Sequence, residues 1–397
     1  MTSQRDSFSA VSRSGWLVSC ALAGMTFTEL EVAGVNPAVV LLAPALIYRS
    51  RLRGSGYSRP AFQSFLSASV ILLALGAAHS LVLGVRVDGR LHGALSFGLA
   101  AMTVWVSGLF APPQLEIVAL RACKMVVAVQ ATLAMLAMAG QTAVAGVPLL
   151  FGGSRFKGLA ENPNQLAIVL LIAVPVLCYG RRRLVWASMA VVPGLLSLSA
   201  GLAVSWATGA ALGALAVFRA TTELAKLRLL GALLVGLAVM PLLVGNPVRI
   251  AFEYAASIVG QGEDEDGNGR LPLNRHGVEA VLASPMVGLG PGMHSGVTGP
   301  HEGGQAHSLP VDWLTQTGVI GALVLVRFLW RAVWRRCTTD PRSAFAAGAF
   351  TAYAFSGYAL RHPIVWVLLL VLYDGRSRAG LPNRSRRAPL IAAASGG

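Results

Sequence analysis

The sequence predicts an all-α, polytopic membrane protein with about twelve transmembrane helices and a large extracytoplasmic loop between helices 9 and 10. Of its 397 residues, 55% are hydrophobic and only 12% are charged, whereas soluble domains carry roughly 25% charged residues. The mean hydropathy is +0.63, which suits lipid rather than water. A soluble fold is therefore excluded, and residues 1–397 are interpreted as a single integral membrane domain.

The predicted helices follow from apolar runs that end at charged residues, Gly or Pro. In chain order the predicted spans are residues 15–33, 36–48, 61–84, 91–111, 117–139, 162–180, 184–199, 201–218, 228–245, 311–330, 342–360 and 362–374. The second and last spans are short. The seventh and eighth come from one continuous apolar run, which we divide at Gly201.

Basic residues account for the formal net charge of +15 and set the predicted orientation. They gather in short connections: Arg49, Arg51, Arg53 and Arg59; Arg181, Arg182 and Arg183; Arg331, Arg335 and Arg336; and the tail from Arg376 to Arg387. With residues 48–59 in the cytoplasm, alternating spans put every cluster inside, as the positive-inside rule expects. Both termini are then cytoplasmic, residues 375–397 form an Arg-rich cytoplasmic tail, and we expect no nucleic-acid partner.

The same alternation places residues 246–310 outside as one extracytoplasmic loop. This loop holds seven carboxylates and four of the seven histidines, and a long polar excursion of this kind is typical of a functional segment. A short helix at the membrane surface is predicted for residues 274–284. Residues 264–269 resemble the first half of a calcium loop, but Arg275 stands at the position of its twelfth ligand. The cysteines share no metal-type spacing, so no metal site is predicted.

One motif is His307-Ser308, followed after nine residues by Gly318-Val319-Ile320-Gly321. The structural interpretation is a helix start capped by Ser308, with Gly318 and Gly321 allowing a neighbouring helix to approach closely. The functional interpretation adds a base. His307 would lie at the outer mouth of a span, where an imidazole can accept a proton from an incoming hydroxyl near neutral pH.

A second motif runs from Arg155 through Lys157 to Asn162-Pro163-Asn164. Asn162 followed by Pro163 is a favourable helix start. Arg155 and Lys157, however, face outward against the positive-inside rule. Outward cations near the lipid surface are suited to a lipid-linked phosphate, because guanidinium and ammonium groups form charge-assisted hydrogen bonds with phosphate oxygens.

Arg275 and Arg361 extend this outward set of cations. Arg275 precedes Glu279 by four residues, so the two can simply pair on a surface helix. The stretch Gly288-Leu289-Gly290-Pro291-Gly292 that follows is not framed as a nucleotide-binding loop, and a turn explains it better. Arg361 stands beside His362 in the last outward turn. All of these groups are predicted to lie at similar depth on one side of the membrane.

Taken together, the motifs resemble the O-antigen ligase/polymerase superfamily of bacterial envelope glycosyltransferases. In order, they are Asn162-Pro163-Asn164, the run Leu196-Ser197-Leu198-Ser199, the stretch from Arg275 to Gly292, and the His307-Ser308/Gly318/Gly321 signature. The sequence departs from the family at one position. The family usually carries an Arg directly after the second Ser of the Leu-Ser-Leu-Ser run, and here that position is Ala200.

The resemblance implies glycan transfer at the outer face of the bacterial cytoplasmic (inner) membrane, without a metal or other cofactor and with inversion at the anomeric carbon. The donor would be a glycan on undecaprenyl pyrophosphate, and the acceptor a hydroxyl of lipid A core or of a polysaccharide, as in lipopolysaccharide or exopolysaccharide synthesis. His307 would be the catalytic base. Arg275, Arg155 and Arg361 would bind the donor pyrophosphate, supported by Asn162, Asn164, Ser308, Gly318 and Gly321.

Three alternatives remain open from the sequence. One is a polymerase that joins repeat units, rather than a ligase that transfers glycan to lipid A core. Another is a multi-pass transporter, which should carry buried ionisable residues or broken helices in its spans. The candidates for such residues are Glu29, Glu31, His79 and His92. The third is a non-catalytic envelope scaffold, which the Ala200 departure allows.

Overall fold

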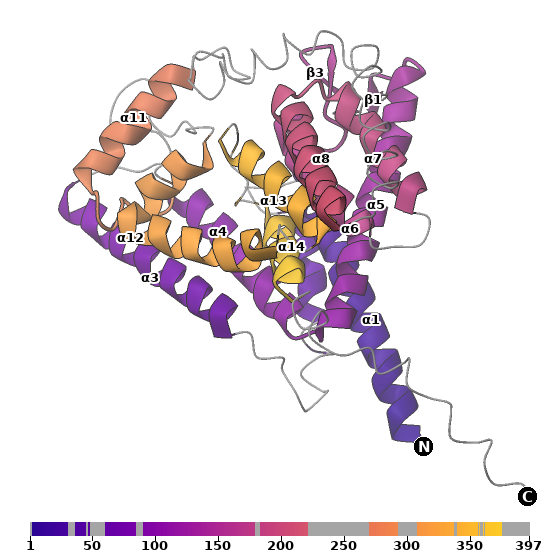
Figure 1. Cartoon of the computed structure of the whole chain (residues 1–397), viewed down its shortest axis with the longest axis horizontal. Coiled ribbons are helices and arrows are strands. Elements are labelled where there is room, and N and C mark those ends of the chain that lie inside the picture. The colour runs from indigo at the N-terminus through magenta and orange to yellow at the C-terminus, as the bar shows by residue number, and fades with distance from the viewer. Residues whose placement is uncertain are drawn as a thin grey trace, which may run out of the picture.

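The chain is almost entirely helical over the part that the computed structural model describes (Figure 1). That part comprises residues 2–30, 36–44, 47, 60–84, 90–178, 183–220, 270–292, 308–336, 340–355, 357, 360 and 362–374. The predicted ninth span at 228–245, the predicted tail at 375–397, and most of the predicted loop at 246–310 lie outside the described residues.

Eleven α-helices are described, most of them in segments predicted to be helical. They are α1 (Thr2–Gly24), α3 (Pro60–Val82), α4 (Arg90–Gly108), α5 (Pro112–Met138), α6 (Pro163–Leu177), α7 (Arg183–Leu196), α8 (Ala200–Ala220), α11 (Arg270–Ala283), α12 (Leu309–Ala332), α13 (Pro341–Ala354) and α14 (Pro363–Asp374). Short 3₁₀ turns are η1 (Thr28–Leu30), η2 (Pro37–Leu41) and η3 (Trp334–Arg336). Helix α11 occupies the place of the predicted surface helix at 274–284.

Membrane-spanning length is met by four of the described helices: Phe62–Val82, Pro112–Met138, Ala200–Arg219 and Leu309–Ala332. Four more apolar helices are shorter: Gly93–Gly108, Pro163–Leu177, Leu184–Leu196 and Pro363–Leu372. The fold is that of a helical membrane protein, whereas the predicted count of about twelve spans stays a prediction. The first predicted span ends earlier than expected, since α1 stops at Gly24. The second begins as the 3₁₀ turn η2.

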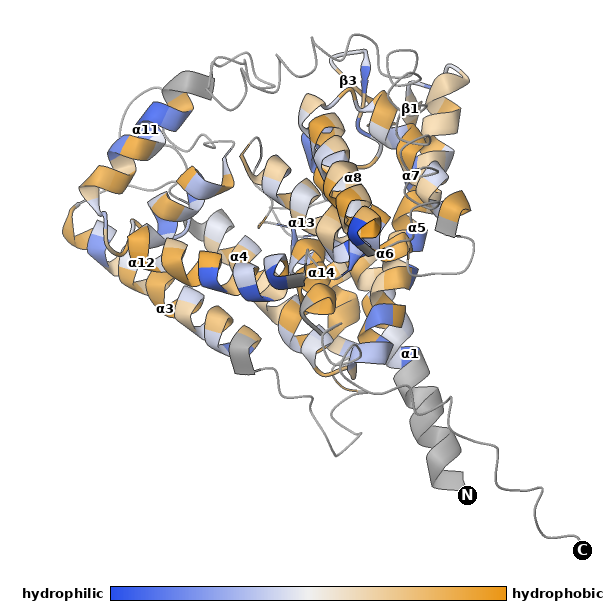
Figure 2. Cartoon of the chain, viewed as in Figure 1, coloured by the Kyte–Doolittle hydropathy of each residue, from blue (hydrophilic) through white to orange (hydrophobic). Residues whose placement is uncertain are grey.

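The helices carry apolar residues outward as well as inward, as lipid contact requires. On α3, Val70, Ile71 and Leu75 are all about half exposed, and on α12 Leu323 and Val326 are more than half exposed. In Figure 2 the ribbons of α3, α12 and α8 are mostly coloured as hydrophobic, while α11 carries hydrophilic as well as hydrophobic residues. Exposed apolar surface on this scale has no place in a soluble monomer, so the outer face of these helices is suited to lipid.

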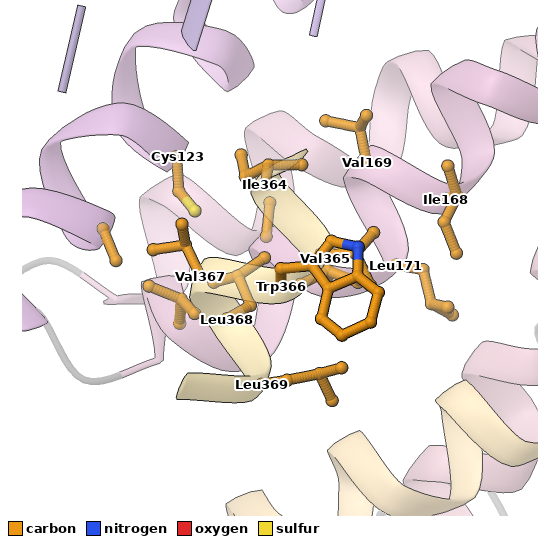
Figure 3. Close-up of a cluster of buried hydrophobic side chains, with 14 of the residues drawn as sticks. Cys123, Ile168, Val169, Leu171, Ile364, Val365, Trp366, Val367, Leu368 and Leu369 are labelled. Atoms are coloured by element: carbon orange, nitrogen blue, oxygen red, sulfur yellow. The ribbon is translucent and has the colours of Figure 1, made fainter. Parts of the chain in front are cut away.

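The core forms where α14 passes between other helices. Trp366 of α14 has no exposed surface, and its Nε1 donates to the carbonyl oxygen of Leu360 at 2.7 Å. Figure 3 shows Trp366 and its neighbours on α14 close to Ile168 and Leu171 of α6. An indole N–H buried among apolar side chains requires such a partner, so the chain just before α14 is fixed together with the helix.

Two small β-hairpins depart from the all-α prediction. Strand β1 (Ala143–Val144) pairs with β2 (Val147–Pro148), and β3 (Leu150–Phe151) pairs with β4 (Arg155–Phe156), both antiparallel. Ala145 and Gly146 both have positive φ at the first turn, which is the geometry that favours a two-residue hairpin. Helical periodicity alone missed these strands, because each is only two residues long. We call this part of the molecule, residues 139–162, the hairpin end.

The boundary between α7 and α8 lies before the predicted position. The chain turns at residues 197–199 rather than at Gly201, and Leu198 adopts φ +50°. The Ser199 hydroxyl oxygen accepts a hydrogen bond from the Leu202 backbone nitrogen at 3.3 Å, which caps the start of α8. The Leu-Ser-Leu-Ser run is therefore the turn itself, and Ala200 is the first residue of the next helix.

Candidate functional site

Helix α12 is broken at Gly318, which has φ +65° and ψ −170° inside an otherwise helical segment. This region of backbone conformation is open essentially to glycine alone. A break at membrane depth leaves backbone groups without helical partners, and these groups must be satisfied inside the protein. The satisfying segment is the one predicted as a turn, residues 284–292.

Backbone hydrogen bonds join that segment, which we call the docking loop, to both sides of the break. The Leu289 nitrogen donates to the Thr315 carbonyl at 2.8 Å, and the Gly290 nitrogen donates to the Gln316 carbonyl at 3.0 Å. From the other side of the break, the Val319 nitrogen donates to the Pro285 carbonyl at 2.8 Å. The docking loop thus replaces the helical ladder that Gly318 interrupts.

The docking explains Gly288 and Gly318, whereas Gly321 is crowded from within its own helix. A Cβ on Gly318 would lie 2.3 Å from the Met286 backbone, and a Cβ on Gly288 would lie 2.4 Å from the Gln316 backbone. A Cβ on Gly321 would lie 2.1 Å from the Thr317 hydroxyl oxygen. The close approach expected at Gly318 is therefore made by a loop rather than by another helix.

Helices α3 and α4 enclose the docking loop from the other side. A Cβ on Gly76 of α3 would lie 2.5 Å from the Gly290 nitrogen, and a Cβ on Gly93 of α4 would lie 2.5 Å from the Gly292 nitrogen. His79 of α3 adds a polar contact, since its Nδ1 lies 2.8 Å from the Ser284 hydroxyl oxygen. Ser284 donates its own proton to the Gly288 carbonyl at 2.6 Å, so Nδ1 of His79 must be the donor to Ser284.

The first half of α12 is unusually polar for a buried helix. Asp312 has no exposed surface, and its Oδ2 accepts a hydrogen bond from Gln316 Nε2 at 2.7 Å. Ser308 is the N-cap residue, as predicted, but its hydroxyl makes no capping hydrogen bond. His307, the predicted base, lies outside the described residues. The described structure therefore fixes the helix that follows His307 and leaves the catalytic role a prediction.

The two outward cations at the hairpin end differ in their partners. Lys157 Nζ lies 2.9 Å from Glu29 Oε2, and the Lys157 side chain is only 6% exposed. Arg155 instead donates from Nε to the Ser197 carbonyl at 3.2 Å. In the described ranges no carboxylate pairs with Arg155. Lys157 is therefore neutralised within the fold, whereas the guanidinium of Arg155 keeps its terminal nitrogens for another group.

The Asn-Pro-Asn motif is tied to the same turn. Asn162 Oδ1 accepts a hydrogen bond from the Gln165 nitrogen at 2.8 Å, so it caps α6 as the structural interpretation predicted. The Asn164 carbonyl accepts a hydrogen bond from the Tyr353 hydroxyl at 2.8 Å, and Asn164 Oδ1 lies 3.4 Å from the Ser199 hydroxyl oxygen. Segments far apart in the sequence thus meet where α6 and α8 begin and α13 ends.

Arg275 lies in a separate place. It projects from α11 with 79% of its side chain exposed, and its Nε lies 3.2 Å from Glu279 Oε1. His276 Nδ1 also lies 3.0 Å from Glu279 Oε2. Figure 1 shows α11 on one flank of the molecule and the hairpins on the other. Arg155 and Arg275 are therefore not brought together, and Arg361, the third predicted cation, lies outside the described residues.

Several residues proposed for other roles have local partners. Glu29 pairs with Lys157, and His79 contacts Ser284. Both residues therefore join separate segments of the fold, and these contacts do not form an ion pathway. Sequence reasoning missed Tyr353, because a tyrosine in an apolar helix gives no positional signal. Over the ranges given above, no group of three or more His, Cys, Asp or Glu residues is placed to hold a metal ion.

Fold and site together define a helical membrane protein in which a glycine-rich loop is built into a broken helix. The family model described as O-antigen ligase matches residues 184–326. This match supports the resemblance to the O-antigen ligase/polymerase superfamily for that part of the chain, which is less than half of its 397 residues. A search of curated proteins found no match.

The matched segment contains much of what has been described above. It runs from the start of α7, through the Leu-Ser-Leu-Ser turn and the docking loop, into α12 beyond Gly321. Arg155, Asn162 and Asn164 precede it, and Arg361 follows it. The interaction between Arg155 and Ser197 therefore links a residue outside the family domain to a motif inside it.

Proposed function

We propose that this protein is a membrane glycosyltransferase that moves a glycan from undecaprenyl pyrophosphate to an acceptor sugar hydroxyl at the outer face of the cytoplasmic membrane. The O-antigen ligase domain supports a glycosyltransferase of the ligase/polymerase type in general. One structural observation supports the proposal most directly. The backbone hydrogen bonds between the docking loop and α12 unite two motifs of that domain into one unit, on the helix that follows His307 in the chain.

In the proposed reaction, the acceptor oxygen forms a bond to the anomeric carbon as the bond from that carbon to the pyrophosphate oxygen breaks. The acceptor proton passes to the imidazole of His307. Undecaprenyl pyrophosphate leaves with the bonding electron pair, and the anomeric configuration inverts. The negative charge that develops on the leaving group requires cationic or hydrogen-bonding groups close by.

Arg155 is the described cation best suited to that leaving group. Its Nε is held by the Ser197 carbonyl, which points the guanidinium toward the turn before Ala200. Ala200 is the position at which the family usually carries an arginine, so Arg155 supplies a charge near the missing one. Arg275 would first have to break its ion pair with Glu279. For Arg361, donor binding stays a prediction from its expected position on the outer side of the membrane.

A His307→Ala variant tests the proposal. Glycan transfer in isolated membranes should fall at least a hundredfold, because loss of a general base costs about 10²–10⁴ in rate. His276→Ala is the matched control, since His276 lies on α11, where it pairs with Glu279 three residues along the same helix. Unchanged transfer in His307→Ala at normal protein level would remove the mechanism.

Ligase and polymerase activities differ in the acceptor and are separated by gene deletion. Loss of a ligase leaves polymer that is no longer attached to lipid A core. Loss of a polymerase shortens the attached glycan to single repeat units. The polymer-length pattern on a gel, together with the lipid A-linked fraction, distinguishes the two.

One observation bears on the transporter alternative. Helix α12 is broken and carries the buried Asp312, and both features are found in ion-coupled transporters. In those proteins the break lines a cavity, whereas here the docking loop fills it with backbone hydrogen bonds. The glycosyltransferase proposal is therefore favoured. Ion-dependent uptake into vesicles that is lost in Asp312→Asn would instead favour transport.

A further inference from the structure

Two cations lie on the face of α5 that points away from the protein core, apart from the site just described. Arg121 and Lys124 are half-buried, while Leu115, Val118, Ala119 and the residues that continue their stripe are fully buried. Arg121 and Lys124 share a helix face with Ile117, which is 48% exposed. The two cations thus belong to the surface that α5 presents to lipid.

Each cation is stacked on a tryptophan from a neighbouring helix. The Arg121 guanidinium carbon lies 4.9 Å from the ring centre of Trp16 on α1, and Lys124 Nζ lies 5.4 Å from the ring centre of Trp186 on α7. Helix α5 packs against both α1 and α7. The four side chains therefore form one band across three helices, which we call the cation–tryptophan band.

Neither cation is neutralised by the described part of the protein. No ion pair joins Arg121 or Lys124 to any carboxylate there, although Glu116 lies on the same helix. Cation–π contact provides only part of the stabilisation that a charge needs when it is partly removed from water. An anion supplied from outside the chain completes the arrangement.

The depth of the band points to the kind of anion. Arg121 is separated from Met138, at the hairpin end of α5, by about 25 Å of helix, close to the roughly 30 Å thickness of a hydrocarbon core. Tryptophan is enriched where the hydrocarbon meets the lipid headgroups. The band therefore lies at the interface opposite the hairpin end, at the level of lipid phosphates.

We infer that Arg121 and Lys124, framed by Trp16 and Trp186, bind the phosphate of an anionic phospholipid. The guanidinium can engage two phosphate oxygens side by side, and the ammonium three positions along supplies a second charge. The acyl chains would then lie along the apolar face that continues from Ile117. This site is independent of the proposed glycosyl transfer and does not rest on it.

Purified full-length protein provides the test, with lipid retention measured by native mass spectrometry against mixed phosphatidylglycerol and phosphatidylcholine. The wild-type protein should prefer phosphatidylglycerol. In the double variant Arg121→Gln/Lys124→Gln that preference should fall about thirtyfold. Each basic residue near the membrane surface contributes about 1 kcal/mol of attraction to anionic lipid, which corresponds to about fivefold. Arg121→Lys/Lys124→Arg keeps both charges and should retain most of the preference. Arg327→Gln/Arg331→Gln removes the same charge from exposed positions on α12, where the cation–tryptophan band is absent, and should reduce the preference clearly less than Arg121→Gln/Lys124→Gln.

Two outcomes would overturn the inference. One is equal phosphatidylglycerol preference in the wild-type protein and in Arg121→Gln/Lys124→Gln. The other is displacement of the bound lipid by millimolar inorganic phosphate, which would identify a site for a soluble anion instead. If the double variant does not fold, the single variants Arg121→Gln and Lys124→Gln decide the matter, since each should lose about fivefold.

Discussion

Lys157 and Glu29 form an ion pair of 2.9 Å at the hairpin end, and the Lys157 side chain is 6% exposed. A backbone hydrogen bond joins the same two segments, since the Glu29 nitrogen donates to the Leu159 carbonyl at 3.1 Å. The pair therefore fastens the chain that follows α1 to the connection before α6. It also decides which of two outward cations remains available, because it occupies Lys157 and leaves Arg155 without a carboxylate in the described chain.

Lys157→Met should destabilise the protein by about 3 kcal/mol, the low end of the range for breaking a buried pair, since Glu29 is 24% exposed. The cost arises because the remaining carboxylate loses its partner. Thermal unfolding in detergent measures the change. Lys157→Met/Glu29→Leu should recover most of it. A double variant as unstable as the single one would show that the charge pair is not the cause.

Arg155→Ala should reduce glycan transfer at least tenfold, because a hydrogen bond to a charged group contributes about 1.5–3 kcal/mol. Transfer is measured in membranes at matched protein level. Adding Ala200→Arg to this variant should restore part of the activity, since it places a guanidinium at the family position on the first residue of α8. Full activity in Arg155→Ala would exclude Arg155 from the donor site.

Gly318→Ala should prevent correct packing of the docking loop onto α12. The added Cβ would lie 2.3 Å from the Met286 backbone, in a conformation that alanine avoids. We expect a loss of stability of more than about 3 kcal/mol, seen as low yield and a lowered unfolding temperature.

Gly84→Ala is the matched control for that substitution. Gly84 also has positive φ, at +68°, but a Cβ there would meet no atom within 4 Å. It should therefore cost only about 1 kcal/mol, the penalty for a left-handed non-glycine residue. Equal effects of the two substitutions would mean that backbone conformation, rather than the docking loop, imposes glycine at position 318.

His79→Asn and His79→Gln distinguish which ring nitrogen matters. The amide nitrogen of asparagine can take the place of Nδ1 and keep the hydrogen bond to Ser284, whereas that of glutamine lies nearer the place of Nε2. Thermal unfolding should show His79→Gln and His79→Ala destabilised by about 1 kcal/mol relative to His79→Asn. The reverse order would assign the contact to the other tautomer.

The helical membrane class was predictable because it depends on composition and on the length of apolar runs. Helices α3, α5 and α8 begin and end within a few residues of the predicted spans. Local signals also identified the cap at Asn162 and the pairing of Arg275 with Glu279, since both depend on residues three or four positions apart. The hairpins were not predictable from helical periodicity, because their strands are too short to show an alternation.

The sequence by itself determined the helical membrane class, the motif residues and the resemblance to O-antigen ligases, because hydropathy and motif spacing are local properties of the chain. Only the tertiary structure decided that Lys157 is neutralised while Arg155 is not, and that Gly318 faces a loop rather than a helix. Both outcomes depend on residues that are distant in the sequence. Glu29 and Lys157 are more than a hundred residues apart, and Met286 and Gly318 are about thirty residues apart. Contacts over such separations arise from packing, which no local pattern specifies.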